Sequence, residues 1–535
     1  VMELPMTQVK GEYREEARDA MDKELKSLKE KTKSIEIVDP STLTDKQKKS
    51  ALKCRFSMTR KRLTPEEIAL QRELGTMKAR LVAQDLKVTS KMDSAETYAG
   101  VPEALVVRMM VADHDKDRHR WASTDFDTAF LQGERYPSNE VCLITYVDLL
   151  TGERFYAWLY TPLYGKQDSA KRWKDTLKKR LCREMDMHEI KNCGSVYKHR
   201  TKDIIAAIHV DDPIVRTSSE ADEKWFFEKL GMCFAIKGIN RLTPDNHLDY
   251  LNTNIKIDTD GNVTMSNHGS SESFRKEHGM EDATPTFSKP NKDQTDELTT
   301  GELVTEDQMS RNRSIGGKLT WLSITCNPGL TVRSQRFCQA TSRAKDPKTW
   351  VRDMCRYLKK CEGYALGRKN DRGMEIVTDA MWGSERKVPN AGSAHSRHGY
   401  LITWNGMPIV WKSRRQKVVA LSSGEAELYG IAESVMTGLH VRYIAEELGL
   451  IREDEITRCS TDSTAAQKFW EKKGIGSEMK HIDLRSAWIK DIEEGSNRIK
   501  VKHIKRTLNG ADMLTKVSTT RETEDWYETY MVKVK

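Results

Sequence analysis

The order of apolar and polar residues predicts helices and strands that alternate along most of the chain. Residues 11–32 place apolar side chains at helical spacing within a charged segment, and residues 102–112 and 169–185 are further helical stretches. Short apolar runs predict strands at three places: Ala79–Ala83, Val141–Thr145 and Ile204–Val210. This interleaving indicates an α/β or α+β body.

The residue composition changes after residue 256. Residues 257–312 are rich in Asp, Asn, Ser, Thr, Gly and Glu and have few large apolar residues, so they predict a linker or a flexible insertion. Residues 314–366 return to a helical texture. The block that follows begins with a strand at Met374–Thr378 and two more strands joined by Asn405-Gly406, the strongest short signal for a hairpin.

A helix comes next, and Ser422 and Glu425 have the spacing of a capping box at its start. The rest of this block predicts a strand, two helices, a strand and a terminal helix: Arg458–Thr461, 464–472, 483–494, Arg498–Ile504 and 509–516. Together these elements make a self-contained α/β unit of ordinary domain size.

Length and charge add a domain count and a class of partner. A chain of 535 residues predicts two to four domains. The net charge of +9 is mild, but residues 345–372 hold nine Lys and Arg against four Asp and Glu, and residues 498–506 hold five basic residues. Such local patches suit a polyanionic partner such as nucleic acid, and a solvated charged face is the alternative.

The ten cysteines are scattered without metal-binding spacing, which indicates a reducing compartment. No apolar run approaches membrane-spanning length and no signal peptide opens the sequence, so we expect a soluble intracellular protein without a membrane partner. Because the sequence begins with Val, we expect it to be a piece of a longer polyprotein.

Two groups of acidic residues follow strand-like segments. Asp211 and Asp212 lie between two apolar runs, at the tip of a predicted hairpin, where an isolated pair is most often a plain turn. Asp125 ends another apolar-flanked strand, with a turn at Gly133. Two-metal phosphoryl transfer needs carboxylates held close together, and magnesium prefers oxygen ligands. These three acids therefore predict a magnesium site.

Several segments carry a resemblance to a known family. In chain order they are Lys78–Ala83, Glu96–Val101, Asp125–Gly133, Leu163–Gly165 with Trp173, and His209–Asp212. Jointly and in this order they resemble the reverse transcriptase of copia-type LTR retrotransposons, almost along the whole chain. The resemblance implies an α+β multidomain fold: a right-hand polymerase of fingers, palm and thumb or connection, followed by an α/β ribonuclease H-like domain.

The resemblance also implies roles for the matching residues. Asp125, Asp211 and Asp212 would hold two Mg²⁺ ions, for which Mn²⁺ is a possible substitute, activate the primer 3′-hydroxyl and neutralise the incoming triphosphate.

Four further residues would bind the nucleotide. Lys78 and Arg80 would grip the triphosphate, although both could equally be surface residues of an exposed strand. Phe130 would lie against the sugar and exclude a 2′-hydroxyl, with core packing as the alternative. Gln167 would contact the nucleotide.

This sequence departs from the family pattern near the first site. His209 replaces the usual Tyr, Pro213 follows the acid pair directly, and Asn252 stands where Gly is common. Lys166-Gln167-Asp168 replaces the usual Leu-Lys-Gln, which puts the role of Gln167 in doubt. None of these changes removes a metal ligand.

The last block has its own set of acids. Asp379 and Asp462 end strands, Glu427 lies in a helix without the capping role of Glu425, and Asp512 begins the last helix. The segments around them, Trp411–Ser413, Leu421–Glu427, Lys480–Asp483 and Ala511–Lys516, resemble the ribonuclease H domain of the same elements. The resemblance implies a second pair of magnesium ions on these four acids.

The family's first ribonuclease H motif often reads Asp-Ala-Asp-Trp, whereas here Met381 replaces the second acid. His503 is more simply a strand-end or substrate-backbone residue than a catalytic one. Five domains are expected: an N-terminal helical or fingers extension (1–77), fingers and palm (78–240), thumb or connection with a flexible segment (241–370), ribonuclease H (371–520) and a C-terminal tail (521–535).

The expected activity is RNA- and DNA-templated DNA synthesis with hydrolysis of the RNA strand of RNA–DNA hybrids. The partners would be RNA template, DNA primer, hybrid, deoxynucleoside triphosphates and other Pol segments, in a cytoplasmic virus-like particle or the nucleus. Two alternatives stay open. One is a decayed or domesticated copy that binds hybrid without polymerising, and the other is a chain in which only the nuclease works.

Overall fold

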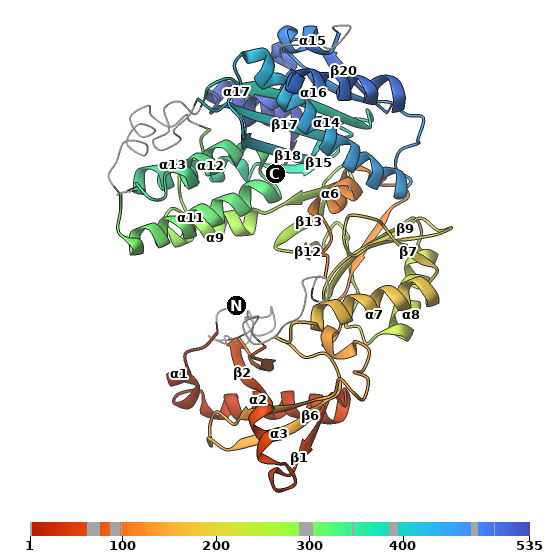
Figure 1. Ribbon diagram of the computed structural model, residues 1–535, viewed down its shortest axis with the longest axis vertical. Helices are drawn as coiled ribbons and strands as arrows, with labels where there is room; N and C mark the ends of the chain where they lie inside the picture. The colour runs from red at the N-terminus through yellow and green to blue at the C-terminus, as the bar shows by residue number, and fades with distance from the viewer. Residues whose placement is uncertain are drawn as a thin grey trace.

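The computed structural model describes residues 3–60, 75–85, 97, 99–287, 303–344, 347–384, 394–471, 480–496 and 498–534. The strands of these residues form four sheets. The sheets lie in successive lobes, from the N-terminal lobe at the bottom of Figure 1 to the C-terminal lobe at its top.

The first lobe is built on the sheet β1-β6-β5-β2-β3. Its side chains alternate between buried and half-buried along β3, and Phe56, Leu81 and Ile144 lie in its core. Its strands are β1 (Ile35–Val38), β2 (Leu52–Arg60), β3 (Met77–Ala83), β5 (Cys142–Val147) and β6 (Arg154–Leu159). Its helical segments are α1 (Met6–Lys10), α2 (Arg14–Lys26), η1 (Ser27–Lys31), η2 (Pro40–Thr42) and α3 (Asp45–Ser50).

The second lobe has the sheet β11-β4-β10-β9-β8-β7. Its central strand β9 is apolar on both faces, because Ile205 packs toward α6 whereas Ala206 and Ile208 pack toward α7 and α8. The strands are β4 (Arg120–Ser123), β7 (Met187–Glu189), β8 (Val196–His199), β9 (Ile204–His209), β10 (Asp212–Thr217) and β11 (Asn240–Arg241). The helices are α6 (Ala104–Ala112), η3 (Ala129–Gln132), α7 (Ser169–Glu184) and α8 (Glu220–Cys233).

The third lobe joins the sheet β12-β13-β14-β15-β21 to a group of helices. Its strands are β12 (Leu248–Tyr250), β13 (Thr253–Ile257), β14 (Val263–Ser266), β15 (Tyr364–Gly367) and β21 (Val532–Lys533). Its helices are α9 (His268–Glu277), α11 (Glu306–Thr325), η4 (Pro328–Leu330), α12 (Thr331–Gln339), α13 (Lys348–Cys361) and α17 (Thr520–Tyr530).

The fourth lobe has the sheet β18-β17-β16-β19-β20, in which the first three strands are antiparallel and β16, β19 and β20 are parallel. Its strands are β16 (Met374–Met381), β17 (Arg397–Trp404), β18 (Met407–Arg415), β19 (Thr457–Thr461) and β20 (Ile499–His503). Its helices are α14 (Ser423–Glu447), α15 (Thr464–Glu471), α16 (Lys480–Asp491), η5 (Ile492–Ser496), η6 (Arg506–Leu508) and η7 (Gly510–Leu514).

Arg108 of α6 joins three lobes. Its buried guanidinium donates to the carbonyl oxygens of Ile324, Thr325 (2.8 and 3.1 Å) and Ile409 (2.9 Å). It also lies 4.2 Å from the ring centroid of Trp411 on β18. No carboxylate forms an ion pair with it among the described residues, and burial lowers its pKa to about 10. The end of α11 and strand β18 are thereby held against the second lobe.

Most of the predicted elements are confirmed. Helix α7 and strands β3, β5 and β9 lie where the apolar pattern placed them, and β17 and β18 form the hairpin through Asn405-Gly406. Ser422 caps α14 by accepting from the Glu425 amide (3.2 Å), but Glu425 accepts from the Leu421 amide rather than completing the box.

Three regions differ from the prediction. The segment 257–312, expected to be a linker or a flexible insertion, contains β14 and α9, because Met265 and Phe274 supply enough apolar area to join the core, and its residues 288–302 lie outside the described residues. Within the N-terminal 77 residues, expected to be a helical or fingers extension, the described part forms helices and also β1 and β2. Residues 521–535, expected to be a tail, form most of α17 and all of β21, with Tyr527 fully buried.

Among the described helices, none combines the length and apolar character needed to cross a bilayer.

Candidate active sites

The first acid group lies at the end of the second sheet. Asp211 occupies the turn of the β9–β10 hairpin, after Val210 at a φ of +56°, and Asp212 opens β10 opposite His209. The Trp173 indole of α7 donates to the Val210 carbonyl (2.7 Å), and the Phe126 amide donates to the Asp211 carbonyl (2.9 Å). The turn that carries the acids is therefore held from both sides.

Asp125 lies two residues beyond β4 and is half exposed. Its carboxylate forms an ion pair with Lys237 (2.8 Å), and the Lys237 amide donates to its carbonyl (2.9 Å). Burial first, and then the charges of Asp125 and Asp211, raise the pKa of Asp212 to about 7. A carboxyl crowded by two others is an environment in which a bound cation would favour ionisation.

The turn between β12 and β13 approaches the same acids, since the Leu251 backbone donates a hydrogen bond to Asp212. Leu251 and Asn252 have φ angles of +49° and +59°. Asn is among the non-glycine residues that tolerate this region, which explains how it can stand where Gly is common.

The predicted nucleotide-binding residues lie on three segments: β3, η3 and the turn that follows Gly165. The Arg80 guanidinium lies 5.3 Å from the Tyr164 ring, and the Phe130 ring meets Tyr164 edge-on at 5.3 Å. Lys78 lies on β3 opposite Thr59. Gly165 has a φ of +82°, and a Cβ there would come within 2.2 Å of the Ala83 carbonyl, so this strand and turn require glycine to pack closely.

Gln167 is engaged within the protein. Its side-chain amide donates to the Asp85 carbonyl (3.2 Å) and carboxylate (3.3 Å), and its backbone amide donates to the same carboxylate (3.2 Å). In this conformation its amide is committed to Asp85.

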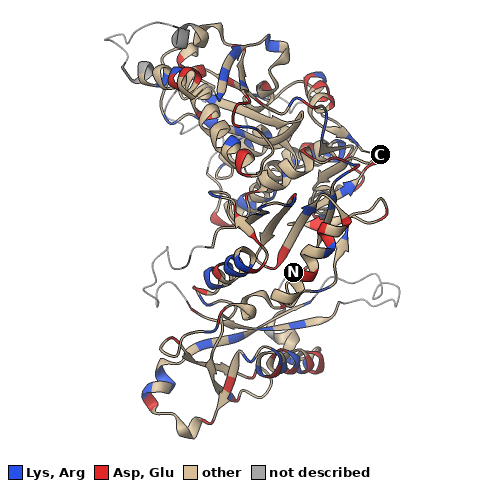
Figure 2. Ribbon diagram, turned by 90° about the vertical axis from the view of Figure 1, so that its right-hand side faces the viewer, with Lys and Arg blue, Asp and Glu red and all other residues tan. Residues whose placement is uncertain are grey.

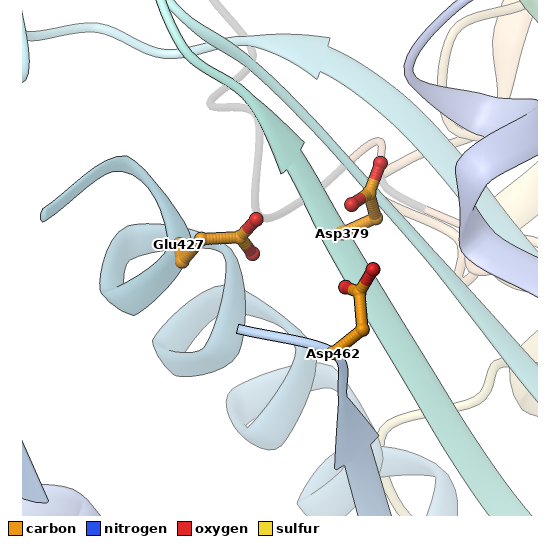
Figure 3. A group of neighbouring side chains, drawn as sticks. All are labelled: Asp379, Glu427 and Asp462. Carbon is orange, nitrogen blue, oxygen red and sulfur yellow. The ribbon is translucent and has the colours of Figure 1, made fainter. Parts of the chain in front are cut away.

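The second acid group lies at the end of the fourth sheet. Asp379 on β16, Glu427 on α14 and Asp462 after β19 can each offer one oxygen such that all three lie within 4.8 Å of one another. Figure 3 shows the three carboxylates turned toward a common space from two strands and one helix. Within the described residues this is the one group that meets that spacing, and the acids of the second lobe do not.

Electrostatics fit a cation at this group. Burial first, and then neighbouring acids, raise the pKa of Glu427 to about 9 and that of Asp379 to about 6. The Glu427 Oε2 atom is buried and has no hydrogen-bond partner among the described residues. A divalent cation that prefers oxygen ligands would give this unpartnered oxygen a binding partner and would also bind the two neighbouring carboxylates.

Asp512, the fourth predicted acid, lies in η7 and forms an ion pair with Lys516 (2.6 Å). Three residues that contact the predicted acids were missed by sequence reasoning. Thr515 donates to the Asp379 carboxylate, Asn509 donates to Asp462, and Lys237 pairs with Asp125. Asn509 stands just before a short helix, an N-cap pattern that could have drawn attention to it.

No family model matches the chain. A Pol polyprotein from tobacco (Nicotiana tabacum) transposon TNT 1-94 is 37% identical over 122 residues, which cover 23% of this chain and 9% of that protein. The Pol polyprotein of Arabidopsis thaliana transposon RE2 is 24% identical over 462 residues, covering 83% of this chain and 30% of the relative. The chain thus spans less than a third of the length of these relatives.

A solved foamy viral protease–reverse transcriptase in complex with double-stranded DNA covers 92% of this chain and 70% of its own, with a TM-score of 0.52 and 11% identity. This likeness confirms the predicted α+β multidomain polymerase fold. The Pol polyproteins of Arabidopsis thaliana transposons RE2 and RE1 match 83% of the chain. The chain is therefore related in sequence to the Pol polyproteins of copia-type retrotransposons and shares its fold with a solved reverse transcriptase.

Proposed function

We propose that this chain copies RNA and DNA templates into DNA and hydrolyses the RNA strand of RNA–DNA hybrids. The observation that carries the proposal is the presence of two separate carboxylate groups, one on a hairpin of the second lobe and one on the fourth sheet. Grouped carboxylates of this kind are the ligands that a two-metal reaction at a phosphodiester or triphosphate uses, which supports the proposal.

Magnesium would be held by Asp125, Asp211 and Asp212 at the first site and by Asp379, Glu427, Asp462 and Asp512 at the second. Bound magnesium supplies charge stabilisation to the attacking and leaving oxygens. At the first site Lys237 must release the Asp125 carboxylate and Asp212 must lose its proton before both can act as ligands. Protons and magnesium therefore compete for Asp212, so primer extension should need more magnesium for half-maximal rate as the pH falls below about 7.

Exposed cations beside the second site support a nucleic-acid substrate. Lys500 and Lys502 project from β20, whose last residue, His503, donates from Nε2 to the Asp462 carbonyl oxygen (3.2 Å). In the described part of the chain, neither lysine forms an ion pair, whereas Arg498 at the start of the strand pairs with Glu446 and Glu453. Figure 2 shows Lys and Arg spread over every lobe. The position of Lys500 and Lys502 beside the second acid group, rather than the overall charge, therefore marks them as candidate contacts for nucleic acid.

A double change of Lys500→Gln and Lys502→Gln should weaken binding of an RNA–DNA hybrid in EDTA. Each lost phosphate contact should reduce the slope of log affinity against log salt by about 1, so a reduction of about 2 is expected. The matched control is Lys224→Gln with Lys229→Gln on α8. An equal loss in the control, or an unchanged slope in the test variant, would contradict a specific role for β20.

Primer extension on an RNA template and cleavage of a labelled hybrid test the activity itself. The wild type should perform both reactions with magnesium. Asp211→Asn should lose extension by at least about 10³-fold and keep cleavage, because it loses a ligand at one site only, and Asp462→Asn should show the reverse. Absence of both reactions in the wild type refutes the proposal, and extension that survives Asp211→Asn refutes the site assignment.

A further inference from the structure

The buried side-chain amide of one residue, Asn509, forms three hydrogen bonds around the second acid group. The Asn509 side chain, 5% exposed, donates from Nδ2 to Asp462 Oδ1 (2.9 Å) and to the Thr378 carbonyl (3.0 Å). Its Oδ1 accepts from the Ala511 amide (3.1 Å) at the start of η7. Strands β19 and β16 and the helix that bears Asp512 thus meet at one residue.

Asn509 lies where the backbone pairing between β16 and β19 has ended, just before the acids. The last paired residues of β16 and β19 are Val377 and Ser460. Beyond them, Thr378 and Asp379 on one strand and Asp462 on the other have no direct backbone pairing to set their separation. Asn509 spans this gap by linking the carbonyl before Asp379 to the Asp462 carboxylate.

The contacts also fix the direction of the amide. Nδ2 faces two acceptors and Oδ1 faces a donor, so the flipped arrangement would set oxygen against the Asp462 carboxylate. Among the described residues, no other side chain donates to that carboxylate. Asp at this position would add a repelling charge, Ala would leave both acceptors without a donor, and Gln is longer by a methylene.

We propose that Asn509 is a positioning residue of the nuclease site, which holds Asp462 at the spacing from Asp379 and Glu427 that a divalent cation requires. The proposal deepens the proposed function and rests on it for the identity of the site. Like-charged carboxylates repel one another, and a fixed donor keeps Asp462 from turning away before the cation arrives. Partners that orient metal ligands in this way affect metal affinity about 10–100-fold.

Calorimetric titration of the full chain with Mn²⁺ tests this directly. Asp211→Asn is placed in every sample so that heat reports on the nuclease site. Asn509→Ala should weaken metal binding about 10–100-fold, and Asn509→Asp, of nearly the same shape, should weaken it at least as much as Ala because its charge replaces a donor. Unchanged affinity in Asn509→Ala would overturn the proposal, as would wild-type affinity in Asn509→Asp.

The third lobe offers a matched control. Asn312 of α11 is fully buried, and its amide donates to the carbonyls of Thr341 and Ala344, each at 2.9 Å, with no acid of either site involved. Asn312→Ala loses the same kind of bonds and should leave metal affinity unchanged. A loss of affinity equal to that of Asn509→Ala would mean that both act only through folding.

Activity assays separate this proposal from the proposed function. With Asp211 restored, Asn509→Ala should keep primer extension, which shows that the chain is folded, and should need about 10–100-fold more Mg²⁺ for half-maximal hybrid cleavage. A wild type that binds metal at this site without cleaving hybrid would refute the proposed function, and the effect of Asn509 on affinity would still be measured.

Discussion

Changing Glu427 to Gln should stabilise the metal-free protein while abolishing hybrid cleavage. The folded-state pKa of Glu427, about 9, lies far above its ordinary value of 4.5 because the carboxyl is buried beside Asp379 and Asp462. Folding therefore favours the protonated form, and this group's contribution to stability falls as pH rises from about 4.5 to about 9. Gln carries no charge and can donate to the neighbouring carboxylates.

Each unit of pKa shift corresponds to about 1.4 kcal/mol, so a gain of at least ~2 kcal/mol is expected for Glu427→Gln in EDTA at pH 8. Thermal unfolding should show a higher melting temperature for the variant, with an advantage that grows from pH 5 to pH 9. Added Mg²⁺ should stabilise the wild type more than the variant, since it binds the folded wild-type site.

Glu433→Gln, on the same helix but outside the acid group, is the control and should change neither stability nor cleavage appreciably. A Glu427→Gln variant that melts below the wild type in EDTA would show that the carboxylate is not a source of strain in the metal-free fold.

The second large effect is expected at Arg108. Changing it to Met keeps much of the side-chain volume but leaves the carbonyls of Ile324, Thr325 and Ile409 without their donor. A buried polar group without a partner costs about 1–3 kcal/mol, so a total loss of about 3–5 kcal/mol is expected. Because this guanidinium joins the second and third lobes to the fourth sheet, their unfolding transitions should also separate.

Differential scanning calorimetry measures both consequences of Arg108→Met. Arg118→Met is the control, because that guanidinium is 59% exposed and pairs with Asp203 at the surface, where such pairs contribute at most about 1 kcal/mol. One transition at the wild-type temperature would mean that the lobes are held by other contacts.

Asp379 and Asp462 could be singled out from the sequence because each comes at or near the end of an apolar run that forms a strand, although β16 continues two residues past Asp379. A strand end restricts where a side chain can lie, so local pattern carries information about the site. Glu427 was separated from Glu425 by the expected capping box, although the Glu425 side chain accepts from the Leu421 amide instead.

The partners of these acids could not be found in the same way. Lys237 reaches Asp125 across 112 residues of sequence, and Asn509 reaches Thr378 across 131. Contacts over such separations depend on how the sheets are assembled. The local spacing of apolar and polar residues carries no information about that assembly. The C-terminal helix was missed for the same reason, because Tyr527 is buried by Tyr357 and Phe287 of the third lobe.

Strand β21 has a consequence for synthesis of the protein. It pairs with β15, so Tyr364 lies opposite Lys533 although 168 residues separate them. While the chain is being translated, the edge of β15 remains without this neighbour until the residues of β21 have left the ribosome. An unpaired strand edge invites association with other chains. Ribosomes stalled within the nuclease region should therefore yield nascent chains that need chaperones more than the finished protein does.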